Sequence, residues 1–451
     1  MPRRTARVPQ TRVGRLAGLA LAAGGLALGG AVEGLRRLAS GTAGGKDGAS
    51  ALLSVGNAQR LATQLARMRG GAMKLGQMLS LQGEGLLPPE FVQALAILRS
   101  QAAAMPASQL RRVIGREYGK GWQDRFERFD EEPIAAASIG QVHRARSADG
   151  RELALKIQYP GIARSIRSDV ANVAMVLRTL DLLPHDTDIS GLAAEAARQL
   201  EQEADYLSEA AFLERYAKLV ADEPRLLVPR VHRDLSTVRI LAMDYMEGEP
   251  LDSLAQSDVA QATRDAIGTL LERLMFRELF EFRTMQTDPN FANYLWQPKT
   301  GKVVLLDFGA TVNFPERFVD AYAHITRAVA AGDREAVARH AAAIGYTFDG
   351  DPPELVEATV ELIMIVCEPL RHKGRYDFGA SDLPSRGREL GFELGVRKGL
   401  LRAPPPETMF LHRKLVGSFL MLAHIRARVD ARALALPLAE RRLRREASRA
   451  R

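Results

Sequence analysis

Apolar residues recur along most of this chain at the spacing of helices, and a central stretch changes to the alternation of strands. Apolar side chains three or four residues apart line one face of a helix, whereas alternation lines one face of a strand. The predicted helices cover residues 51–82, 162–183, 192–219 and 259–282 and the region from Gly309 to about Arg432, and a short helix and turn lie within 107–129. The predicted strands lie within 129–157 and over 152–158, 228–232 and 238–246.

The strand region contains two turn signals. Asp149-Gly150 predicts a tight hairpin, because glycine adopts the positive φ that such turns need. The small residues from Ala135 to Gly140 predict a second turn between strands. Lys156 lies in the strand that follows the hairpin. Pro404-Pro405-Pro406 interrupts the late helices and predicts a loop.

At 451 residues, with 46% of them hydrophobic, the chain is long enough for two or three domains with sizeable cores. The formal net charge of +8 is concentrated at the ends, since residues 1–32 and the segment after Pro437 are rich in arginine. No nucleic-acid motif accompanies these charges, so anionic lipid or solvent is favoured over nucleic acid. Cys367 is the only cysteine, which excludes an internal disulfide and a cysteine-cluster metal site.

Residues 16–32 form an apolar run behind the N-terminal arginines. The run lies at the lower length limit for a membrane-spanning helix. Three interpretations stay open: a cleaved secretory signal, a spanning or shallow membrane anchor, and a poorly ordered tail. We favour the anchor. The glycine-rich residues 41–48 that follow are typical of a linker.

The strongest chemical signal is the pair of segments Met-Gln-Thr-Asp-Pro-Asn and Asp-Phe-Gly-Ala. Asp288 and Asn293 are five residues apart, and Asp307 follows Asn293 by fourteen. Kinase folds use a loop Asp, an Asn five residues later and the Asp of Asp-Phe-Gly for phosphoryl transfer and magnesium binding. Carboxylate and amide oxygens are the ligands that Mg²⁺ prefers. The spacing favours a catalytic loop over an ordinary turn rich in Asp and Asn.

Other candidate residues have ordinary alternatives. Lys156 follows the alanine turn as a phosphate-pairing lysine follows the phosphate-covering turn of a kinase, although a lone strand lysine is more often an edge residue. Asp205 and Glu209 share a helix face, and we leave open whether one pairs with Lys156 or both lie on a solvated acidic surface. Three further groups of candidates remain. For Lys74 and Gln77 a solvated helix surface is the simpler interpretation, and Met243, Asp244 and Met246 are hinge residues or ordinary strand-end residues. His412-Arg413-Lys414 lie on a late predicted helix, where we expect a basic solvated turn.

Taken together, these segments resemble the UbiB/AarF atypical kinase-like family, and the Met-Gln-Thr-Asp-Pro-Asn form resembles its coenzyme Q branch. The resemblance runs from about residue 50 to about residue 430. It is carried by six ordered motifs: Lys74-Leu-Gly-Gln77, Ala135-Ala-Ala-Ser-Ile-Gly-Gln-Val-His143, Lys156-Ile-Gln-Tyr-Pro-Gly161, Glu203-Ala-Asp-Tyr-Leu-Ser-Glu209, Met285-Gln-Thr-Asp-Pro-Asn290 and Asp307-Phe-Gly-Ala310.

The resemblance implies an α+β, bilobal protein-kinase-like fold with an N-terminal helical extension packed over the active site. The implied divisions are a basic and apolar tail with a linker (1–49), the helical extension (50–128), a small lobe with a helical insertion (129–250), a large lobe (251–435) and a basic C-terminal tail (436–451).

The resemblance also implies roles for the candidate residues. Lys156 would pair with Glu209 and reach the phosphates of ATP or ADP, and Asp288 would take the position of the catalytic base. Asn293 and Asp307 would bind Mg²⁺. The phosphates would be covered by Ala135, Ala136, Ala137, Ser138, Ile139 and Gly140, and the base contacted near Met243, Asp244 and Met246. The extension would supply Lys74 and Gln77 and be held by Glu203 and Asp205.

The implied function is an ATPase or small-molecule kinase that supports ubiquinone biosynthesis at a membrane. The alternatives are a nucleotide-gated scaffold or lipid-binding chaperone for quinone-synthesis enzymes and, less favoured, an ordinary protein kinase. The expected partners are anionic membrane lipids, lipid-like quinone precursors and ubiquinone-biosynthesis enzymes, and a homodimer is allowed. The expected location is a bacterial inner membrane, with peripheral or single-anchor attachment and the catalytic domain facing the cytoplasm.

Overall fold

The computed structural model describes residues 104–137, 139–179, 189–394, 398, 400 and 406–449. The expected helix over 51–82, the apolar run, Lys74 and Gln77 lie outside these residues. Contacts divide the chain into two compact units. The first unit comprises the chain up to Ala211 together with Arg230–Met246, and the second comprises Phe212–Pro229 and Glu247–Arg451.

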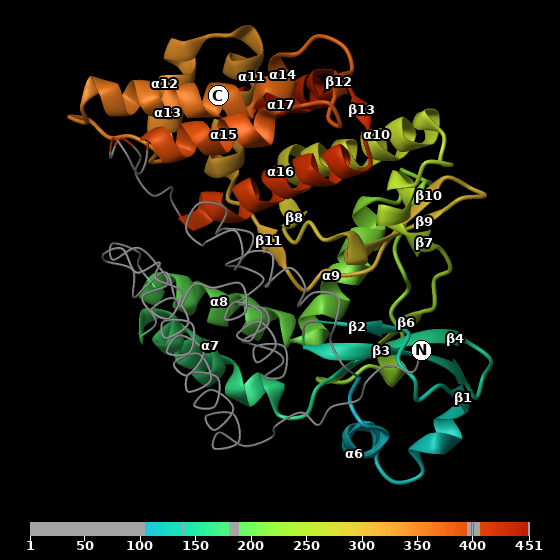
Figure 1. The fold of residues 1–451 in the computed structure, drawn as a ribbon. Coiled ribbons are helices and arrows are strands. Elements are labelled where there is room, and N and C mark those ends of the chain that lie inside the picture. The colour runs from blue at the N-terminus through green and yellow to red at the C-terminus, as the bar shows by residue number, and fades with distance from the viewer. Residues whose placement is uncertain are drawn as a thin grey trace, which may run out of the picture. The chain divides into compact units, whose positions relative to one another are not determined.

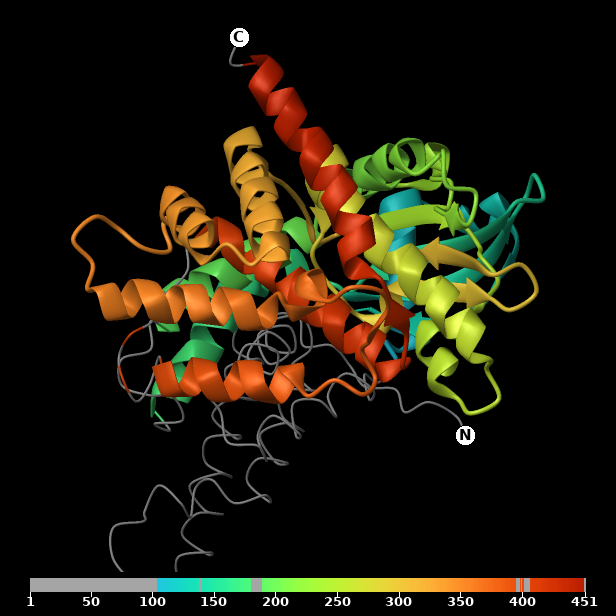
Figure 2. The ribbon, with the colours of Figure 1, turned by 90° about the horizontal axis from the view of Figure 1, so that it is seen from above.

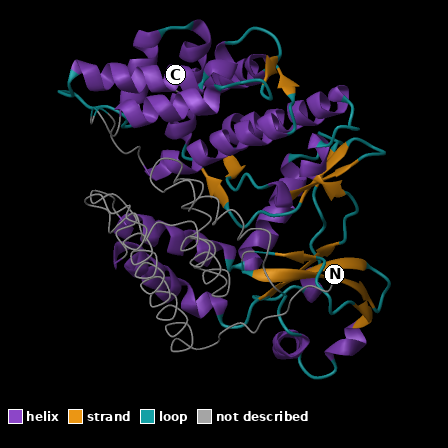
Figure 3. Cartoon of the chain, viewed as in Figure 1, coloured by secondary structure: helices purple, strands orange, loops and turns teal. Residues whose placement is uncertain are grey.

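The first unit is built on a five-stranded antiparallel sheet (Figures 1 and 3). Its order is β1-β3-β4-β6, and β2 also pairs with β3. β3 and β4 form the predicted hairpin, in which Gly150 has a φ of 87°. Lys156 therefore lies on an interior strand, not at an edge. The strands are β1 Phe126–Phe129, β2 Ala135–Ala136, β3 Gly140–Ser147, β4 Glu152–Gln158 and β6 Ile240–Asp244.

The helices of the first unit differ from the prediction at one point. α8 ends at Glu203 and α9 begins at Tyr206, so the single helix expected over 192–219 is wrong. Asp205 interrupts it: its carboxylate accepts hydrogen bonds from the backbone N–H groups of Leu207 at 3.2 Å and Ser208 at 3.1 Å. Asp favours this capping position over a helix interior. The helices are α6 Ala107–Tyr118, α7 Ile162–Thr179, α8 Ile189–Glu203 and the first turns of α9 Tyr206–Leu219.

The second unit consists mainly of helices, with short strand pairs among them (Figure 3). Its strands pair in the orders β5-β10-β9-β7, β8-β11 and β12-β13. The helices are α10 Gln261–Arg277, which continues as a π-helical turn over Glu278–Phe282, α11 Glu316–Ala331, α12 Arg334–Ala343, α13 Pro353–Val366, α14 Glu368–Arg371, α15 Leu383–Phe392, α16 Pro406–His424 and α17 Ala431–Arg449. The strands are β5 Leu226–Leu227, β7 Glu249–Pro250, β8 Thr284–Gln286, β9 Tyr294–Gln297, β10 Lys302–Leu305, β11 Thr311–Asn313, β12 Tyr376–Asp377 and β13 Arg428–Val429.

Two strand expectations need correction. The strand predicted over 228–232 is reduced to a single bridge between Val231 and Met243, followed by a 3-10 turn over Arg233–Leu235. The region after Gly309 is mainly helical as predicted, but β11, β12 and β13 interrupt it. These strands are two or three residues long, too short to give an alternating pattern that sequence periodicity could detect.

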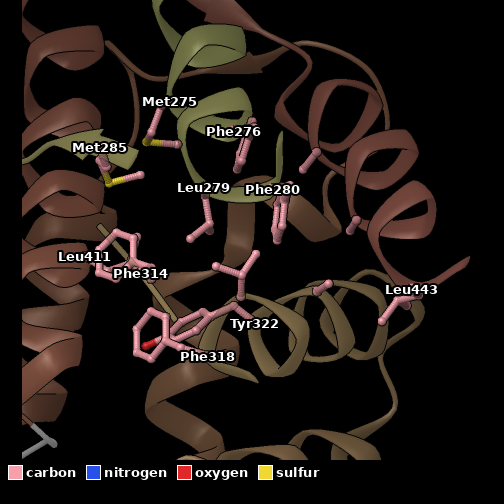
Figure 4. Packing of buried hydrophobic residues seen from close by; sticks show 14 of the residues in the cluster. Met275, Phe276, Leu279, Phe280, Met285, Phe314, Phe318, Tyr322, Leu411 and Leu443 are labelled. Carbon is pink, nitrogen blue, oxygen red and sulfur yellow. The ribbon is translucent and has the colours of Figure 1, made fainter. Parts of the chain in front are cut away.

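Buried apolar side chains from distant segments form the main core of the second unit (Figure 4). α10 and its π-helical turn face α11, α16 and α17 across this core. The small residues Ala435 and Ala439 let α17 pack closely. The boundary between large lobe and C-terminal tail, which we placed at 435/436, falls inside α17, and residues up to Leu443 belong to the core. The cluster includes Met275, Phe276, Leu279, Phe280, Met285, Phe314, Phe318, Tyr322, Leu411 and Leu443.

A sheet-based unit and a helix-rich unit confirm the predicted α+β class. Within the described ranges, no helix combines the length and apolarity needed to cross a bilayer.

Candidate active site

In the first unit, Lys156 and Glu209 form the predicted ion pair. The Lys156 Nζ atom lies 2.7 Å from Glu209 Oε1 and 2.9 Å from Oε2. The pair is almost fully enclosed, with 8% of the lysine side chain and none of the glutamate side chain exposed. The Tyr206 ring lies 5.3 Å from the ammonium. Such a pair holds the lysine in one direction, as phosphate binding by a kinase-like lysine requires.

The alanine turn is closed by a hydrogen bond from the Ala137 N–H to the Gly140 carbonyl at 2.9 Å. Ala135 and Ala136 are exposed, whereas the Ile139 side chain is buried, so Ile139 offers a ligand only its backbone. Gly140 is required by close approach: a Cβ there would overlap the Ile157 carbonyl oxygen and lie 2.9 Å from the Tyr206 hydroxyl. Ser138 lies outside the described residues.

The three hinge candidates have different environments. Met243 is buried in β6. The Asp244 carboxylate is engaged by His232 Nε2 at 2.7 Å and by the Arg230 N–H at 3.2 Å, and the Asp244 N–H donates to the Arg230 carbonyl. Met246 follows these sheet contacts and is half-buried. The contact of these three residues with a nucleotide base stays a prediction.

In the second unit, two loops that carry the Asp and Asn residues are joined at both ends. The first loop connects β8 to β9 and carries Asp288 and Asn293, and the second connects β10 to β11 and carries Asp307. β9 pairs with β10, and β8 pairs with β11. The Leu306 N–H donates to the Asn293 carbonyl at 2.9 Å, and the Thr287 N–H donates to the Ala310 carbonyl at 3.0 Å. The pairing thus brings together residues that are thirteen or more positions apart.

Hydrogen bonds orient the side chains within these loops. Asn293 Nδ2 donates to the Asp288 carbonyl at 3.0 Å and to Asp288 Oδ2 at 3.1 Å. Asp307 Oδ1 accepts from the Gly309 N–H at 2.9 Å. Because the Asn293 amide nitrogen is turned toward Asp288, its oxygen, the atom that a cation would bind, is turned elsewhere.

These donors fit a magnesium ion. Asn293 and Asp307 line the same small cavity, of about 10 Å³. No cluster of three or more His, Cys, Asp and Glu side chains suited to a metal occurs in the described part of the chain. Magnesium in nucleotide enzymes is held by one or two carboxylates, water and phosphate oxygens, so a dedicated protein cage is not needed.

Comparison with known proteins identifies the family. Residues 97–341 match the ABC1 atypical kinase-like domain. The atypical kinase COQ8B, mitochondrial, of Rattus norvegicus is 41% identical over 436 residues, which cover 96% of this chain and 81% of the relative. The chain belongs to the ABC1 atypical kinase-like family. The atypical kinase COQ8, mitochondrial, of Saccharomyces cerevisiae is 36% identical over 425 residues, covering 94% and 83% of the two chains.

These relatives place the chain in the coenzyme Q branch of the UbiB family, as the motifs predicted. The predicted class, an atypical kinase-like enzyme of the branch that supports ubiquinone biosynthesis, is confirmed. A solved structure of Rv3197 from Mycobacterium tuberculosis, in complex with erythromycin, shares 28% identity. It covers 87% of this chain and 98% of its own, with a TM-score of 0.59, and supports the bilobal kinase-like fold.

The family resemblance assigns Glu203 and Asp205 to holding the extension, and the structure gives these two residues different surroundings. Glu203 is buried at the end of α8, whereas Asp205 caps α9. Residues 50–103 of the extension, with Lys74 and Gln77, lie outside the described residues, so their contacts with Glu203 and Asp205 stay a prediction.

His412-Arg413-Lys414 lie on a late helix, α16, as predicted, but the expectation that this basic turn is solvated is wrong, because Lys414 is 4% exposed. Lys414 Nζ lies 3.2 Å from the Tyr294 hydroxyl and 3.5 Å from Glu278 Oε2. Burial lowers the pKa of Lys414, but its attraction to Glu278 and its hydrogen bond with Tyr294 outweigh burial and hold the pKa above the usual value.

The other two residues of this segment, His412 and Arg413, also form hydrogen bonds within the second unit. Burial lowers the pKa of His412 to about 4, so the ring is neutral near pH 7. Arg413 Nε donates to the Thr287 carbonyl at 2.7 Å, and Arg413 Nη2 donates to Thr287 Oγ1 at 3.0 Å. Sequence reasoning missed these contacts because α16 lies more than a hundred residues from the loop that it touches. Three consecutive basic residues on an otherwise apolar helix were the available signal.

Proposed function

We propose that this ABC1 family member binds ATP with Mg²⁺ and either hydrolyses it or transfers its γ-phosphoryl group to a small molecule in ubiquinone biosynthesis. The observation that carries this proposal is the joining of the Asp288–Asn293 loop to the Asp307 loop at both ends. Phosphoryl transfer relies mainly on positioning and charge stabilisation, and a rigid pair of acidic loops supplies both.

Each candidate residue has a role in this proposal. Asn293 and Asp307 hold the magnesium ion, which neutralises charge that develops on the phosphates. Asp288 lies within hydrogen-bonding distance of Asn293 and orients the attacking hydroxyl or water. Lys156, fixed by Glu209, contacts the phosphates beneath the alanine turn. The exposed methyl groups of Ala135 and Ala136 replace the glycines of an ordinary kinase and limit how closely the turn approaches the nucleotide.

Phosphate release by the purified full-length protein tests the proposal. We expect hydrolysis that requires Mg²⁺, is increased by a phenolic mimic of a quinone precursor, and is lost in Asp307→Asn. The control is Asp258→Asn, which changes an exposed carboxylate in the same unit. Absence of Mg²⁺-dependent hydrolysis in the unsubstituted protein, or equal hydrolysis by Asp307→Asn, would contradict the proposal.

An Asp288→Asn variant separates catalysis from a nucleotide-gated scaffold. Asparagine keeps the size of the side chain but removes the charge that orients a nucleophile. If this variant still binds ATP and restores quinone synthesis in a deletion strain, turnover is dispensable and the scaffold is favoured. We expect binding without restoration.

We also propose attachment to an anionic membrane, in a bacterial cell the cytoplasmic face of the inner membrane. The support in the described residues is a hollow of about 550 Å³ on the second unit, lined by six arginines and two glutamates. The lining residues are Glu281, Arg283, Glu316, Arg441, Arg442, Arg444, Arg445, Ser448 and Arg449. Lipid-like quinone precursors and other enzymes of the pathway are the partners that such a location would supply.

A further inference from the structure

We propose that helix α16 is a clamp that fixes the position of the magnesium-binding loops. The inference rests on the proposed function, because it concerns the same Asp288, Asn293 and Asp307. It assigns a positioning role to Arg413, Gly417 and Thr287, none of which touches the nucleotide in the proposed mechanism. Figure 1 shows α16 running beside β8 and β11, the strands that flank these loops.

Arg413 links α16 to both loops through a single residue. Its guanidinium donates to the Thr287 carbonyl at 2.7 Å and to the Thr287 hydroxyl at 3.0 Å. The same hydroxyl donates to the Ala310 carbonyl at 2.8 Å. Thr287 directly precedes Asp288, and Ala310 closes the Asp-Phe-Gly-Ala segment. The Arg413 guanidinium therefore holds the first loop through two charge-assisted hydrogen bonds. The Thr287 hydroxyl, which accepts one of them, also bonds the second loop and so links the two.

One turn along the helix, Gly417 sets the distance between α16 and the first loop. A Cβ on Gly417 would overlap Cγ and Cβ of Pro289, closer than side chains approach in real structures. Pro289 follows Asp288 directly, and its ring has little freedom to move. Any larger residue at 417 must therefore displace the backbone that carries Asp288. Glycine is needed at position 417 because of the close contact with Pro289, and not because of the backbone conformation of α16.

Two further contacts hold the far side of the first loop. The Phe291 ring lies 5.0 Å from the His424 ring, at the C-terminal end of α16. Lys414 Nζ donates a hydrogen bond to the Tyr294 hydroxyl, and Tyr294 directly follows Asn293. α16 thus contacts this segment at four positions: Thr287, Pro289, Phe291 and Tyr294. Thr287 and Pro289 lie on either side of Asp288, and Tyr294 follows Asn293.

The clamp is itself anchored in the second unit. Leu411 is fully buried in the main core with Met285, the residue two positions before Thr287 (Figure 4). Lys414 also approaches Glu278, whose Oε1 atom accepts the Gln286 N–H at 3.2 Å and the Tyr216 hydroxyl at 2.8 Å. These buried contacts fix α16 and β8 to the same core. A shift of α16 would therefore also shift the loops that β8 and β11 flank.

The direct test is Gly417→Ala, measured as phosphate release over a range of Mg²⁺ concentrations. We expect the Mg²⁺ concentration for half-maximal rate to rise about tenfold or more, since a displacement of about 1 Å in a catalytic group can cost about a hundredfold. Binding of a fluorescent ADP analogue in EDTA should stay within about twofold of the unsubstituted protein. The matched control is Gly391→Ala in α15, where a Cβ would meet nothing within 4 Å.

A second pair of variants keeps the test decisive if Gly417→Ala does not fold. Thr287→Val preserves shape but removes the hydroxyl that joins Arg413 to Ala310, and we expect it to raise the Mg²⁺ requirement. Thr287→Ser retains the hydroxyl and should recover most of the loss. Unchanged Mg²⁺ dependence in Gly417→Ala or Thr287→Val would overturn the clamp while leaving the proposed function intact. An unsubstituted protein without Mg²⁺-dependent turnover would instead contradict the proposed function.

Discussion

The enclosed ion pair of Lys156 and Glu209 is a structural contact, and the proposed function gives it a chemical role as well. Both charges have left water, so each depends on the other for compensation. The pair lies on an interior strand and on α9, which explains why its loss should affect both folding and catalysis. Replacing only one of the two residues does not separate the effect on folding from the effect on catalysis. Replacing both residues together does.

Glu209→Gln should lower the free energy of unfolding by about 3–5 kcal/mol, because it leaves the Lys156 charge buried without a counter-charge. The double variant Lys156→Met/Glu209→Met removes both charges at similar volume and should recover most of that stability. It should not recover ATP hydrolysis, since it lacks the ammonium group that we propose contacts the phosphates. Urea unfolding and phosphate release measure the two effects. Recovered hydrolysis in the double variant would remove Lys156 from the mechanism.

Glu272 on α10 gives a prediction about pH. Burial raises its pKa to about 7, against a countering effect of Lys414. Between its usual pKa of 4.5 and 7, the folded protein keeps a proton that the unfolded chain releases. The free energy of unfolding contributed by this group is therefore fully present below pH 4.5 and is lost as pH rises toward 7. The loss amounts to about 3 kcal/mol, at about 1.4 kcal/mol for each pKa unit.

Glu272→Gln should remove that part of the pH dependence. We expect the variant to match the unsubstituted protein near pH 5 and to exceed its stability near pH 8, as measured by urea unfolding at both pH values. Glu335→Gln, at an exposed position on α12, is the control and should leave the pH dependence unchanged. Parallel pH profiles for Glu272→Gln and the unsubstituted protein would show that another group is responsible.

At the scale of elements, Asp205 decides where α9 begins. It accepts from two backbone N–H groups that have no carbonyl partner in the first helical turn. Asp205→Ala should lower the free energy of unfolding by about 1 kcal/mol, and Asp205→Asn should restore it, because asparagine also caps. Thermal unfolding measures both.

Asp333 provides the comparison, since its carboxylate accepts from the Ala336 N–H at 2.9 Å at the start of α12. Asp333→Ala should cost a similar amount of stability and leave ATP hydrolysis unchanged. If Asp205→Asn regains stability but loses hydrolysis, the carboxylate charge has the second role, in holding the extension, that the family resemblance implies. No loss of stability in Asp205→Ala would contradict the capping role.

The elements that the sequence predicted well are those whose signals are local. The hairpin at Asp149-Gly150 and the helix before the catalytic loop depend on turn chemistry and on apolar periodicity. The break at Asp205 was equally local, but the apolar pattern continued across it and masked the cap. The short strands β8 and β11 exist because they pair with each other, and neither has a pattern of its own.

At the scale of the whole molecule, motif spacing predicted the residues that the two joined loops carry, but not what holds those loops in place. Asp288, Asn293 and Asp307 were identified from the chain alone because kinase-like chemistry fixes their spacing. Arg413 and Gly417 were missed, because their contacts depend on where α16 packs against a loop more than a hundred residues away. Lys414 was misjudged for the same reason: a charged side chain is expected in water unless a buried partner is known.

The arginines of the C-terminal helix are held by packing and ion pairs, which the sequence alone did not reveal. The arginines after Pro437 looked like a basic tail, but they lie on α17, the red helix that leads to the C-terminus in Figure 2. This helix belongs to the second unit and contributes Ala435, Ala439 and Leu443 to its core. Arg442 and Arg449 pair with Asp320, and Arg441 pairs with Glu281. The charges are therefore held in place around the hollow, and six arginines against two glutamates leave an excess of positive charge there.

Arg444 and Arg445 are the residues of this hollow best suited to a test of anionic lipid binding. Arg444 has one distant carboxylate, Glu440 at 3.9 Å, and within the described ranges Arg445 has no ion pair. Replacing both with glutamine should weaken sedimentation with vesicles containing anionic phospholipid about thirtyfold, at about 1 kcal/mol for each charge near the surface. Binding to neutral vesicles should not change, and added salt should reduce the difference.

The matched control is Lys299→Gln/Lys373→Gln, which removes the same charge from two exposed positions of the second unit. A loss confined to the arginine variant would assign the membrane contact to the hollow, since net charge is equal in the two variants. Equal weakening in both would mean that the lipid responds to net charge, and unchanged binding in both would place the attachment elsewhere in the chain. Either result would contradict the hollow as the contact site. Residues next to the hollow and next to the proposed magnesium-binding loops, Leu443 and Met285, belong to the same core cluster. A specific lipid contact at the hollow would therefore act on the core that also supports the candidate site.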